Sequence, residues 1–224
     1  MARTGRAEFL ETVRQAVAAG APPETGEPDP VSVEPSPPPA GDLGKLFARE
    51  AAAADAEVIR AGSLPEAREA IRSLLRGLGA KRVVRGDTGL LHELALPGGD
   101  FELRAQRLDP SIEPADLRAA AAAADVGLTE ADYGIAESGS LVLLHRPGQG
   151  RLVSLLPPVH VAILRVAQLL PDLGALFRRL ASDERHASAL TFISGPSRTG
   201  DIEFVLTKGV HGPRELHVVL VDDG

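Results

Sequence analysis

The sequence contains no cysteine and few aromatic residues, and both shortages restrict its chemistry. Without thiols the chain has no disulfide, no thiolate zinc site, no Cys-ligated iron–sulfur cluster and no cysteine nucleophile. Six Phe, one Tyr and no Trp provide few rings on which nucleobases could stack. The 31 Asp and Glu outnumber the 24 Lys and Arg, giving a formal net charge of −7, whereas nucleic-acid binding needs a basic face. We therefore expect no nucleic acid among its partners.

The sequence also lacks a long uninterrupted apolar run. Its longest apolar stretch, residues 153–170, is broken by two prolines, a histidine, an arginine and a glutamine, so it is a poor membrane span. The N-terminal MARTGRAEFLETVRQ has neither the apolar core nor the small-residue cleavage site of a secretory signal. These features predict a cytoplasmic protein without a membrane span.

The remaining composition is that of an ordinary globular protein, because 44% of the 224 residues are apolar. Residues 1–20 predict a short amphipathic helix with Leu10, Val13 and Val17 on one face. Residues 21–40 contain eight prolines and no basic residue, which is typical of an extended linker. The folded domain is then expected over residues 41–224.

Helix and strand patterns alternate from residue 41 onward. Ser63 is the expected N-cap of a helix whose apolar residues recur at helical spacing as far as Leu78. The other helices are expected at 43–54, 90–96 and 114–124, and the strands at 57–60, 82–84 and 101–105. This alternation predicts an α/β fold with a Rossmann-like, mostly parallel sheet flanked by helices.

The second half of the chain is denser in predicted strands. They are expected at 133–137, 141–145, 152–155, 159–164, 189–194 and 215–221, with Ser138-Gly139-Ser140 as a tight turn. Pro171 is expected in the first turn of a helix, where proline is favoured. The closing segment ELHVVLV is almost continuously apolar, which predicts a strand buried on both faces.

Four polar segments with glycines lie at predicted strand ends, where α/β sheets bind ligands. They are residues 127–133, 136–140, 195–203 and 209–217. In the third, a strand leads through Gly195-Pro196-Ser197-Arg198-Thr199 to a predicted helix start. Backbone N–H groups there, together with Arg198, could hold a phosphate or carboxylate. The alternative is simple capping of the helix by Ser197 or Thr199. The segment is not a P-loop, because the Gly-Lys-Ser/Thr ending is absent.

Glu137 ends an apolar strand beside the Ser-Gly-Ser turn. A carboxylate in this place could act as a general base or a nucleophile, or it could cap neighbouring backbone N–H groups. Ser138 and Ser140 are poor serine-hydrolase candidates, since the Gly-x-Ser-x-Gly elbow is absent.

Three histidines, His160, His211 and His217, could converge, but their spacing follows no metal-ligand pattern. We therefore predict no metal site. His211, in a Val-His-Gly-Pro loop, is the favoured ligand contact, whereas His160 and His217 lie in strand patterns and are interpreted as structural.

The blocks GLTEADYGIAESGSLVL, GRLVSLLPPVHVAIL, ISGPSRTGDIE and GVHGPRELHVVLVD follow one another between Gly127 and Asp222. Together they resemble the LUD-domain family, and within it the lactate utilization protein C group. The resemblance implies a fold similar to that of ribose-5-phosphate isomerase, glucosamine-6-phosphate deaminase and CoA transferases. It also implies a part in oxidising L-lactate to pyruvate, as the cluster-free member of a system with two iron–sulfur proteins.

Some CoA transferases carry a Glu-x-Gly turn at a strand end, and Glu137-Ser138-Gly139 has this shape. The resemblance therefore suggests that Glu137 is a reactive or ligand-orienting carboxylate in a cleft also lined by Arg198 and His211.

Three functions stay open at this point. The first is an accessory or regulatory subunit with a pocket for a small anion or a nucleotide-like ligand. The second is an independent transferase or ligase acting on a phosphate- or CoA-bearing substrate, and the third is an interaction module for the iron–sulfur partners. No cofactor is identified, and a homo-oligomer stays open.

The candidate catalytic residue is Glu137, and the candidate ligand-binding residues are Thr129, Ser138, Gly139, Gly195, Ser197, Arg198, Thr199 and His211.

Overall fold

The computed structural model describes residues 5–19, 41–106, 112–182, 187–200 and 206–222. Residues 1–36 and 37–224 form two separate compact units. Within the first unit, α1 (Arg6–Ala19) is a helix on which Phe9, Leu10, Val13 and Val17 are exposed.

The second unit follows the predicted alternation of helices and strands. Its described helices are α2 (Leu43–Ala53), α3 (Leu64–Gly77), α4 (Gly89–Glu93), α5 (Pro114–Ala122), α6 (Leu152–Leu155) and α7 (Leu173–Ala181), with one 3-10 turn, η1 (Val166–Gln168). Its described strands are β1 (Glu57–Ala61), β2 (Arg82–Gly86), β3 (Glu102–Gln106), β4 (Val126–Glu130), β5 (Tyr133–Ile135), β6 (Ser140–His145), β7 (Val159–Arg165), β8 (Leu169–Leu170), β9 (Ala189–Ile193), β10 (Arg198–Gly200), β11 (Leu206–Lys208) and β12 (Glu215–Val221).

Six strands form a parallel sheet in the order β1-β12-β7-β4-β2-β3, which confirms the predicted α/β fold. The last strand, β12, lies between β1 and β7, and its residues Leu216 to Val221 are all buried. A central strand has other strands on both edges and packed layers on both faces, so a continuous apolar sequence suits it. The expectation for ELHVVLV is therefore confirmed.

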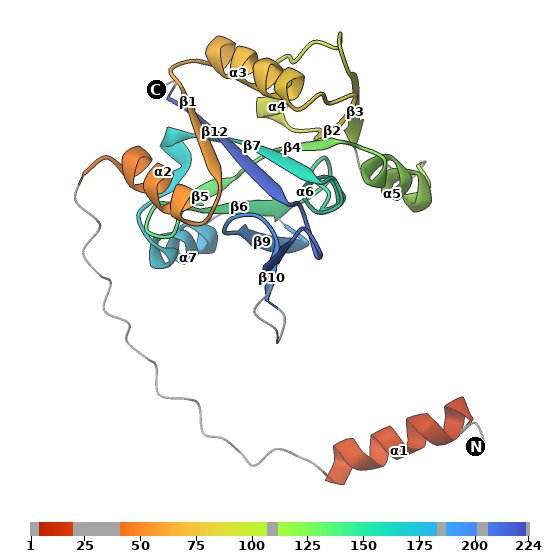
Figure 1. Cartoon of the computed structure of the whole chain (residues 1–224). Helices are drawn as coiled ribbons and strands as arrows, with labels where there is room; N and C mark the ends of the chain where they lie inside the picture. The colour runs from red at the N-terminus through yellow and green to blue at the C-terminus, as the bar shows by residue number, and fades with distance from the viewer. Residues whose placement is uncertain (1–4, 20–40, 107–111, 183–186, 201–205, 223–224) are drawn as a thin grey trace. The chain divides into compact units, whose positions relative to one another are not determined.

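Different layers cover the two faces of this sheet (Figure 1). On one face α3 and α4 pack against the sheet, with Ile71, Leu75 and Leu91 almost completely buried. On the other face lie α2, through Phe47, and a second sheet, through Leu141 and Leu143.

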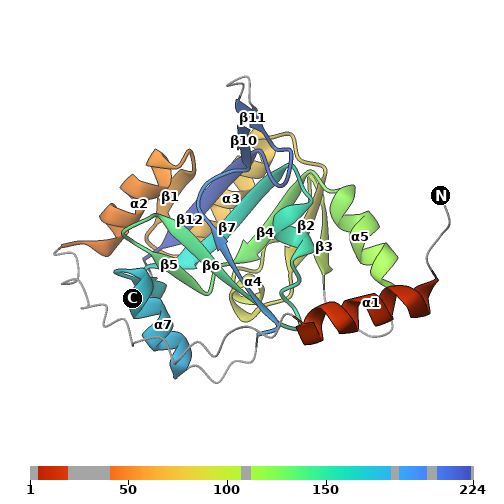
Figure 2. The same cartoon turned by 90° about the horizontal axis from the view of Figure 1, so that it is seen from below.

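The second sheet has four strands in the order β8-β5-β6-β9. The β5–β6 and β6–β9 pairs are antiparallel, and β5–β8 is parallel. Figure 2 shows β5 and β6 crossing the strands of the parallel sheet. The outer face of the second sheet packs against α7, whose Leu176 is fully buried.

Helix ends follow the expected capping chemistry in one case and depart from it in another. The Ser63 hydroxyl accepts a hydrogen bond from the Glu66 N–H (3.4 Å) at the start of α3, as predicted. Pro171, in contrast, precedes α7 instead of lying in its first turn. The N-cap of α7 is Asp172, whose carboxylate accepts from the Ala175 N–H at 2.6 Å.

One strand was not predicted, and two local expectations are wrong. Residues 127–130, part of the polar segment expected at a strand end, form most of β4. Residues 152–155 form the short helix α6, since a four-residue apolar run does not distinguish helix from strand. The predicted helix start after Gly195 is a strand: β10 pairs with β11 as an antiparallel hairpin.

Two glycines of the predicted site allow loops to pack closely on the C-terminal end of α2. Gly139 has φ +62°, and a Cβ there would overlap the backbone of Ala51. Gly195 has φ +89°, and a Cβ there would overlap the carbonyl oxygen of Ala54. Both positions therefore require glycine for conformation and for space.

We predict that Gly139→Ala destabilises the protein by at least about 2 kcal/mol, because it combines a left-handed backbone with an overlap against main-chain atoms. For a chain of this size the melting temperature should fall by roughly 4–8 °C. Gly77→Ala is the matched control, since Gly77 lies in α3 with no atom within 4 Å of an added Cβ. Its melting temperature should stay the same or rise. Equal melting temperatures for the two variants would contradict the close-packing explanation.

Candidate functional site

A pocket of about 180 Å³ lies between the two sheets. We call it the inter-sheet pocket. Its walls come from β7, β12, β9, α6 and the loops 194–197 and 211–213. Its polar side chains are Ser154, His160, Thr191, Ser194, Ser197 and His211. None of the described residues that line it is Asp, Glu, Lys or Arg.

The inter-sheet pocket lies at the amino ends of parallel strands. His160 is the second residue of β7, and Leu216 is the second residue of β12. Ligands of open α/β sheets usually bind beyond the carboxyl ends. The second sheet explains why a pocket forms at these amino ends. The end of β9 lies beside them and forms the opposite wall of the pocket.

His160 lies in this pocket with one ring nitrogen already engaged. Its Nε2 is 2.8 Å from the Thr129 hydroxyl, so Nδ1 is the ring nitrogen that stays available. Burial and, to a smaller extent, the neighbouring His217 lower the pKa of His160 to about 4, so the imidazole is neutral at pH 7. A neutral imidazole can donate or accept a hydrogen bond, and the direction of the Thr129 bond decides which at Nδ1.

Thr191 lines the pocket, and its hydroxyl is engaged by His145. Burial lowers the pKa of His145, which is therefore neutral at pH 7. Its Nδ1 lies 3.1 Å from the Gln149 carbonyl oxygen, which only accepts, so Nδ1 carries the proton. The unprotonated Nε2 then accepts from the Thr191 hydroxyl at 2.7 Å. Thr191 has donated its only proton and can offer a ligand only an acceptor.

Ser197 has the opposite character. Its hydroxyl oxygen accepts from the His211 N–H at 3.3 Å and keeps its own proton for a ligand. The Ser197 N–H donates to the Pro213 carbonyl at 2.8 Å, which ties the two loops together. The structure thus brings the predicted residues Gly195, Ser197 and His211 into one pocket.

A chain of hydroxyls connects the Ser-Gly-Ser turn with the pocket. The hydroxyl oxygens of Ser138 and Ser140 are 2.8 Å apart, and those of Ser140 and Ser194 are 2.7 Å apart. Ser194 lines the inter-sheet pocket, whereas Ser138 is exposed. The turn is therefore connected to the pocket through Ser140, which was not among the candidate ligand-binding residues.

Glu137 caps a helix. Its carboxylate accepts from the Leu173 N–H (3.1 Å), the first residue of α7, and its own N–H donates to the Pro171 carbonyl (3.1 Å). The exposed Glu137 is not among the residues described as lining the inter-sheet pocket. This placement corresponds to the capping alternative, because helix N-termini attract carboxylates.

Arg198 is paired outside the pocket. Its guanidinium lies 2.6 Å from the carboxylate of Asp55, just beyond α2, and the arginine is 38% exposed. Thr199 lies in β10 opposite Thr207 of β11. The expected anion cradle at a helix start is not formed, because Arg198–Gly200 is a strand. The structure does not bring Glu137, Arg198 and His211 into one described pocket.

Sequence reasoning missed several residues of the pocket. Ser154, Thr191 and Ser194 were not among the candidates, and His160 was interpreted as structural. Ser154 and Ser194 lie in two of the motif blocks, which was the local signal available for them. The contribution of His160 depends on how β9 covers β7, and a single sequence carries no signal for that.

His217, the third of the histidines considered above, is not among the residues described as lining the inter-sheet pocket. His217 Nδ1 is 3.1 Å from the Glu57 carboxylate, but neither ring nitrogen has a hydrogen-bond partner of acceptable geometry among the described residues. In the described part of the chain no group of three or more His, Cys, Asp or Glu is placed to hold a metal ion. No described helix has the length and apolar character to cross a membrane.

Comparisons with known proteins agree with the fold and with the motif blocks. The LUD domain family model matches residues 44–221. Lactate utilization protein C of Halalkalibacterium halodurans is 48% identical over 104 residues, 45% of each chain. The protein of the same name from Shouchella clausii is 39% identical over 154 residues, which are 65% of this chain and 64% of the relative. The chain thus matches about half to two thirds of the length of these relatives.

Two further comparisons cover more of the chain. Uncharacterized protein YkgG of Escherichia coli is 36% identical over 163 residues, 70% of each chain. The crystal structure of a DUF162 family protein from Deinococcus radiodurans superimposes with a TM-score of 0.62 at 26% identity, covering 82% of this chain and 99% of that one.

We predict that His160 titrates near pH 4 and makes stability depend on pH. Its folded pKa is below the unfolded value of about 6.5, so the unfolded chain binds more protons between these pH values. The stabilisation is complete above pH 6.5 and is lost as the pH falls towards 4, by an amount on the order of 3 kcal/mol. Denaturant unfolding at pH 7 and pH 4.5 should show a larger loss for the wild type than for His160→Asn.

The ring signals of His160 in an NMR titration provide the direct measurement. A midpoint near pH 6.5 would mean that the imidazole is not buried as described.

Proposed function

This chain belongs to the LUD domain family, and we propose that it is a component of a cytoplasmic system that oxidises L-lactate to pyruvate. The relatives named lactate utilization protein C support the role in lactate utilization. Within that system we propose an accessory or regulatory subunit that senses a small ligand in the inter-sheet pocket.

The composition agrees with the accessory role. Moving electrons from lactate requires a redox centre, and this sequence has no cysteine with which to ligate an iron–sulfur cluster. The resemblance of the motif blocks implies two iron–sulfur companions, and we propose that they carry the electrons and that this subunit acts with them.

The inter-sheet pocket supports a small hydroxy acid as the ligand, and this observation carries the proposal. Ser197 retains a hydroxyl proton that can be donated to a carboxylate, and the exposed His211 ring lines the same wall. Thr191 offers only acceptor lone pairs, which match the hydroxyl of lactate better than the keto oxygen of pyruvate. At about 180 Å³ the pocket is smaller than the roughly 300–1,000 Å³ of drug-sized sites, which favours a small acid over a nucleotide.

The positions of the charged candidates favour this role over a transferase. A transferase that uses Glu137 needs that carboxylate beside the bound substrate, yet Glu137 caps α7 and Arg198 pairs with Asp55. The described lining of the inter-sheet pocket contains no charged nucleophile.

An interaction role is the second candidate, and the apolar face of α1 supports it. Phe9, Leu10, Val13 and Val17 are all at least 40% exposed within their own unit. Such a face suits a partner protein, so residues 1–40 are the segment to test for partner binding.

We predict that L-lactate raises the melting temperature of the purified protein more than pyruvate does. A ligand at 100 times its Kd stabilises by roughly 2.7 kcal/mol, which corresponds to roughly 5–10 °C for a chain of this size. The Thr191 hydrogen bond should make lactate bind up to about tenfold more tightly than pyruvate. His211→Ala should reduce both shifts, whereas His92→Ala, on the exposed face of α4, should not.

CoA and ATP serve as comparison ligands in the same assay. A large shift with either of them, and none with lactate, would contradict the hydroxy-acid pocket and favour the transferase.

Growth on lactate distinguishes the sensing role from the interaction role. In a strain that lacks its own lactate utilization protein C, His211→Ala and Ser197→Ala should grow more slowly than wild type on L-lactate and equally well on glucose. His92→Ala is again the control. Normal growth of both pocket variants, with loss of growth only on deletion of residues 1–40, would assign the function to partner binding instead.

A further inference from the structure

A second pocket, of about 240 Å³, lies apart from the site described above. We call it the His145 pocket. Its polar lining consists of Gln106, His145, Arg151 and Ser188, and none of its described lining residues is acidic. It shares no described lining residue with the inter-sheet pocket.

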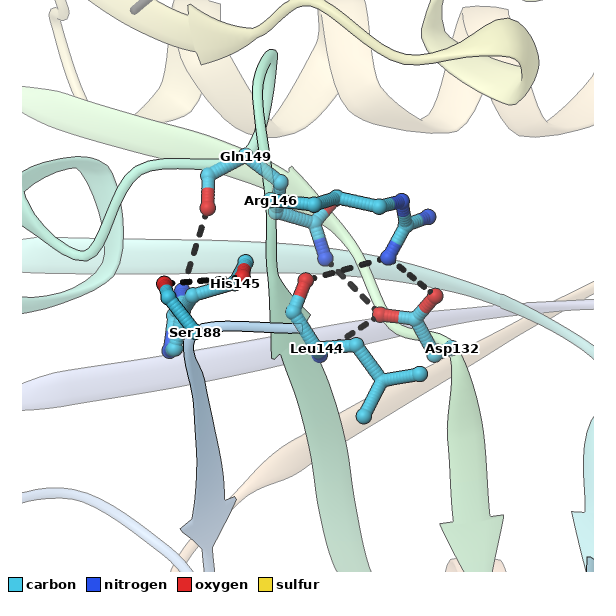
Figure 3. A network of polar contacts seen from close by, with 6 residues as sticks. All are labelled: Asp132, Leu144, His145, Arg146, Gln149 and Ser188. Carbon is cyan, nitrogen blue, oxygen red and sulfur yellow. Dashed lines mark hydrogen bonds and ion pairs between the residues drawn. The ribbon is translucent and has the colours of Figure 1, made fainter. Parts of the chain in front are cut away.

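Hydrogen bonds on both sides fix the orientation of His145 (Figure 3). Its Nδ1 donates to the Gln149 carbonyl, and its own carbonyl oxygen accepts from the Ser188 N–H (2.8 Å) and hydroxyl (3.1 Å). The ring is neutral at pH 7, as derived above. The wall that it forms is therefore rigid and uncharged.

Two of the charges near this wall, Asp132 and Arg146, pair with each other. The carboxylate of Asp132 is fully buried, lies 2.7 Å from the Arg146 guanidinium, and accepts from the Leu144 N–H (2.8 Å) and the Gln149 amide (2.9 Å). Figure 3 shows these donors grouped around the carboxylate. Asp132 is thus committed to its own partners and cannot neutralise a second arginine.

Arg151 is the cation that remains. It lines the His145 pocket and is exposed, and its positive charge lowers the pKa of His145. Its guanidinium has no ion-pair or hydrogen-bond partner among the described residues. Gln106 adds a further donor, because it gives one amide proton to the Leu117 carbonyl (2.7 Å) and retains the other. The Arg151 guanidinium and the Gln106 amide are both hydrogen-bond donors, and only the guanidinium is charged.

The location is also one at which α/β proteins bind ligands. Gln106 is the last residue of β3, so the pocket lies at the carboxyl end of a parallel strand. The inter-sheet pocket, in contrast, lies at amino ends.

We propose that the His145 pocket is a second binding site for a small oxyanion, a carboxylate or a phosphate, held by the guanidinium of Arg151 and the amide of Gln106 against the His145 wall. Arginine forms paired, charge-assisted hydrogen bonds with either group. This site is additional to the proposed sensing of lactate and does not depend on it.

Hydrogen bonds connect the linings of the two sites. The Ser154 hydroxyl, in the inter-sheet pocket, donates to the carbonyl oxygen of Arg151, which lines the His145 pocket (3.1 Å). His145 lines one pocket, and its Nε2 accepts from Thr191, which lines the other. Only the His145 side chain therefore separates an anion in the His145 pocket from Thr191, the residue proposed to accept a hydrogen bond from the lactate hydroxyl.

Isothermal titration calorimetry of the full chain tests the proposal, with inorganic phosphate and acetate as separate probes and chloride keeping the ionic strength constant. Wild type should show saturable binding of at least one probe, and the stronger probe identifies the preferred oxyanion. Arg151→Ala should weaken that binding about tenfold or more, while Arg151→Lys should retain part of it. Arg179→Ala, which removes an equal charge from α7, should bind like wild type.

Two results would overturn the site. One is the absence of saturable binding in wild type, and the other is unchanged affinity in Arg151→Ala. His211→Ala should leave the binding intact, since His211 lines only the inter-sheet pocket, so failure of the lactate proposal and failure of this one are distinguishable. Should Arg151→Ala not fold, the NMR signals of the His145 ring in wild type decide, because a bound oxyanion must shift them and an empty pocket leaves them unchanged.

Discussion

Burial of one face of the parallel sheet by α2 and the second sheet is the constraint on which the rest of this structure depends. Phe47 and Ala51 of α2 and Leu141 and Leu143 of β6 are completely buried against that face. The apolar area removed from water holds the two sheets together. The inter-sheet pocket is the region where this packing is incomplete, at the ends of β7, β12 and β9.

Close packing of this kind leaves polar groups inside, and their partners decide what the site can do. The Asp132–Arg146 pair satisfies its own charges in the interior. The His145–Thr191 bond fixes a tautomer and thereby makes Thr191 an acceptor. Desolvation keeps His160 neutral. The inter-sheet pocket therefore discriminates by the direction of its hydrogen bonds, whereas Arg151 gives the His145 pocket a net charge.

The fold was predictable to a greater extent than the site. Apolar periodicity located β12 and α3, and local capping chemistry identified Ser63, because these signals depend on neighbouring residues in the chain. The segment after Gly195 was mispredicted, since a glycine–proline loop is compatible with a helix or a hairpin and only pairing with β11 decides between them. Gly195, Ser197 and His211, which were candidates on motifs, line the inter-sheet pocket together with His160 and Thr191, which lie in ordinary strand sequences.

The sequence by itself determined the α/β class, the buried final strand and the exclusion of thiol chemistry, because composition and periodicity act through local structure and average burial. The motif blocks between Gly127 and Asp222 indicated the family. Tertiary structure alone decided that Glu137 caps α7, that Arg198 pairs with Asp55 and that His160 lines a pocket. A carboxylate, a guanidinium and an imidazole each have several suitable partners. Which partner each one meets depends on how two sheets distant in the sequence pack together, and hydrophobic packing fixes that arrangement without reference to the polar groups that it brings into contact.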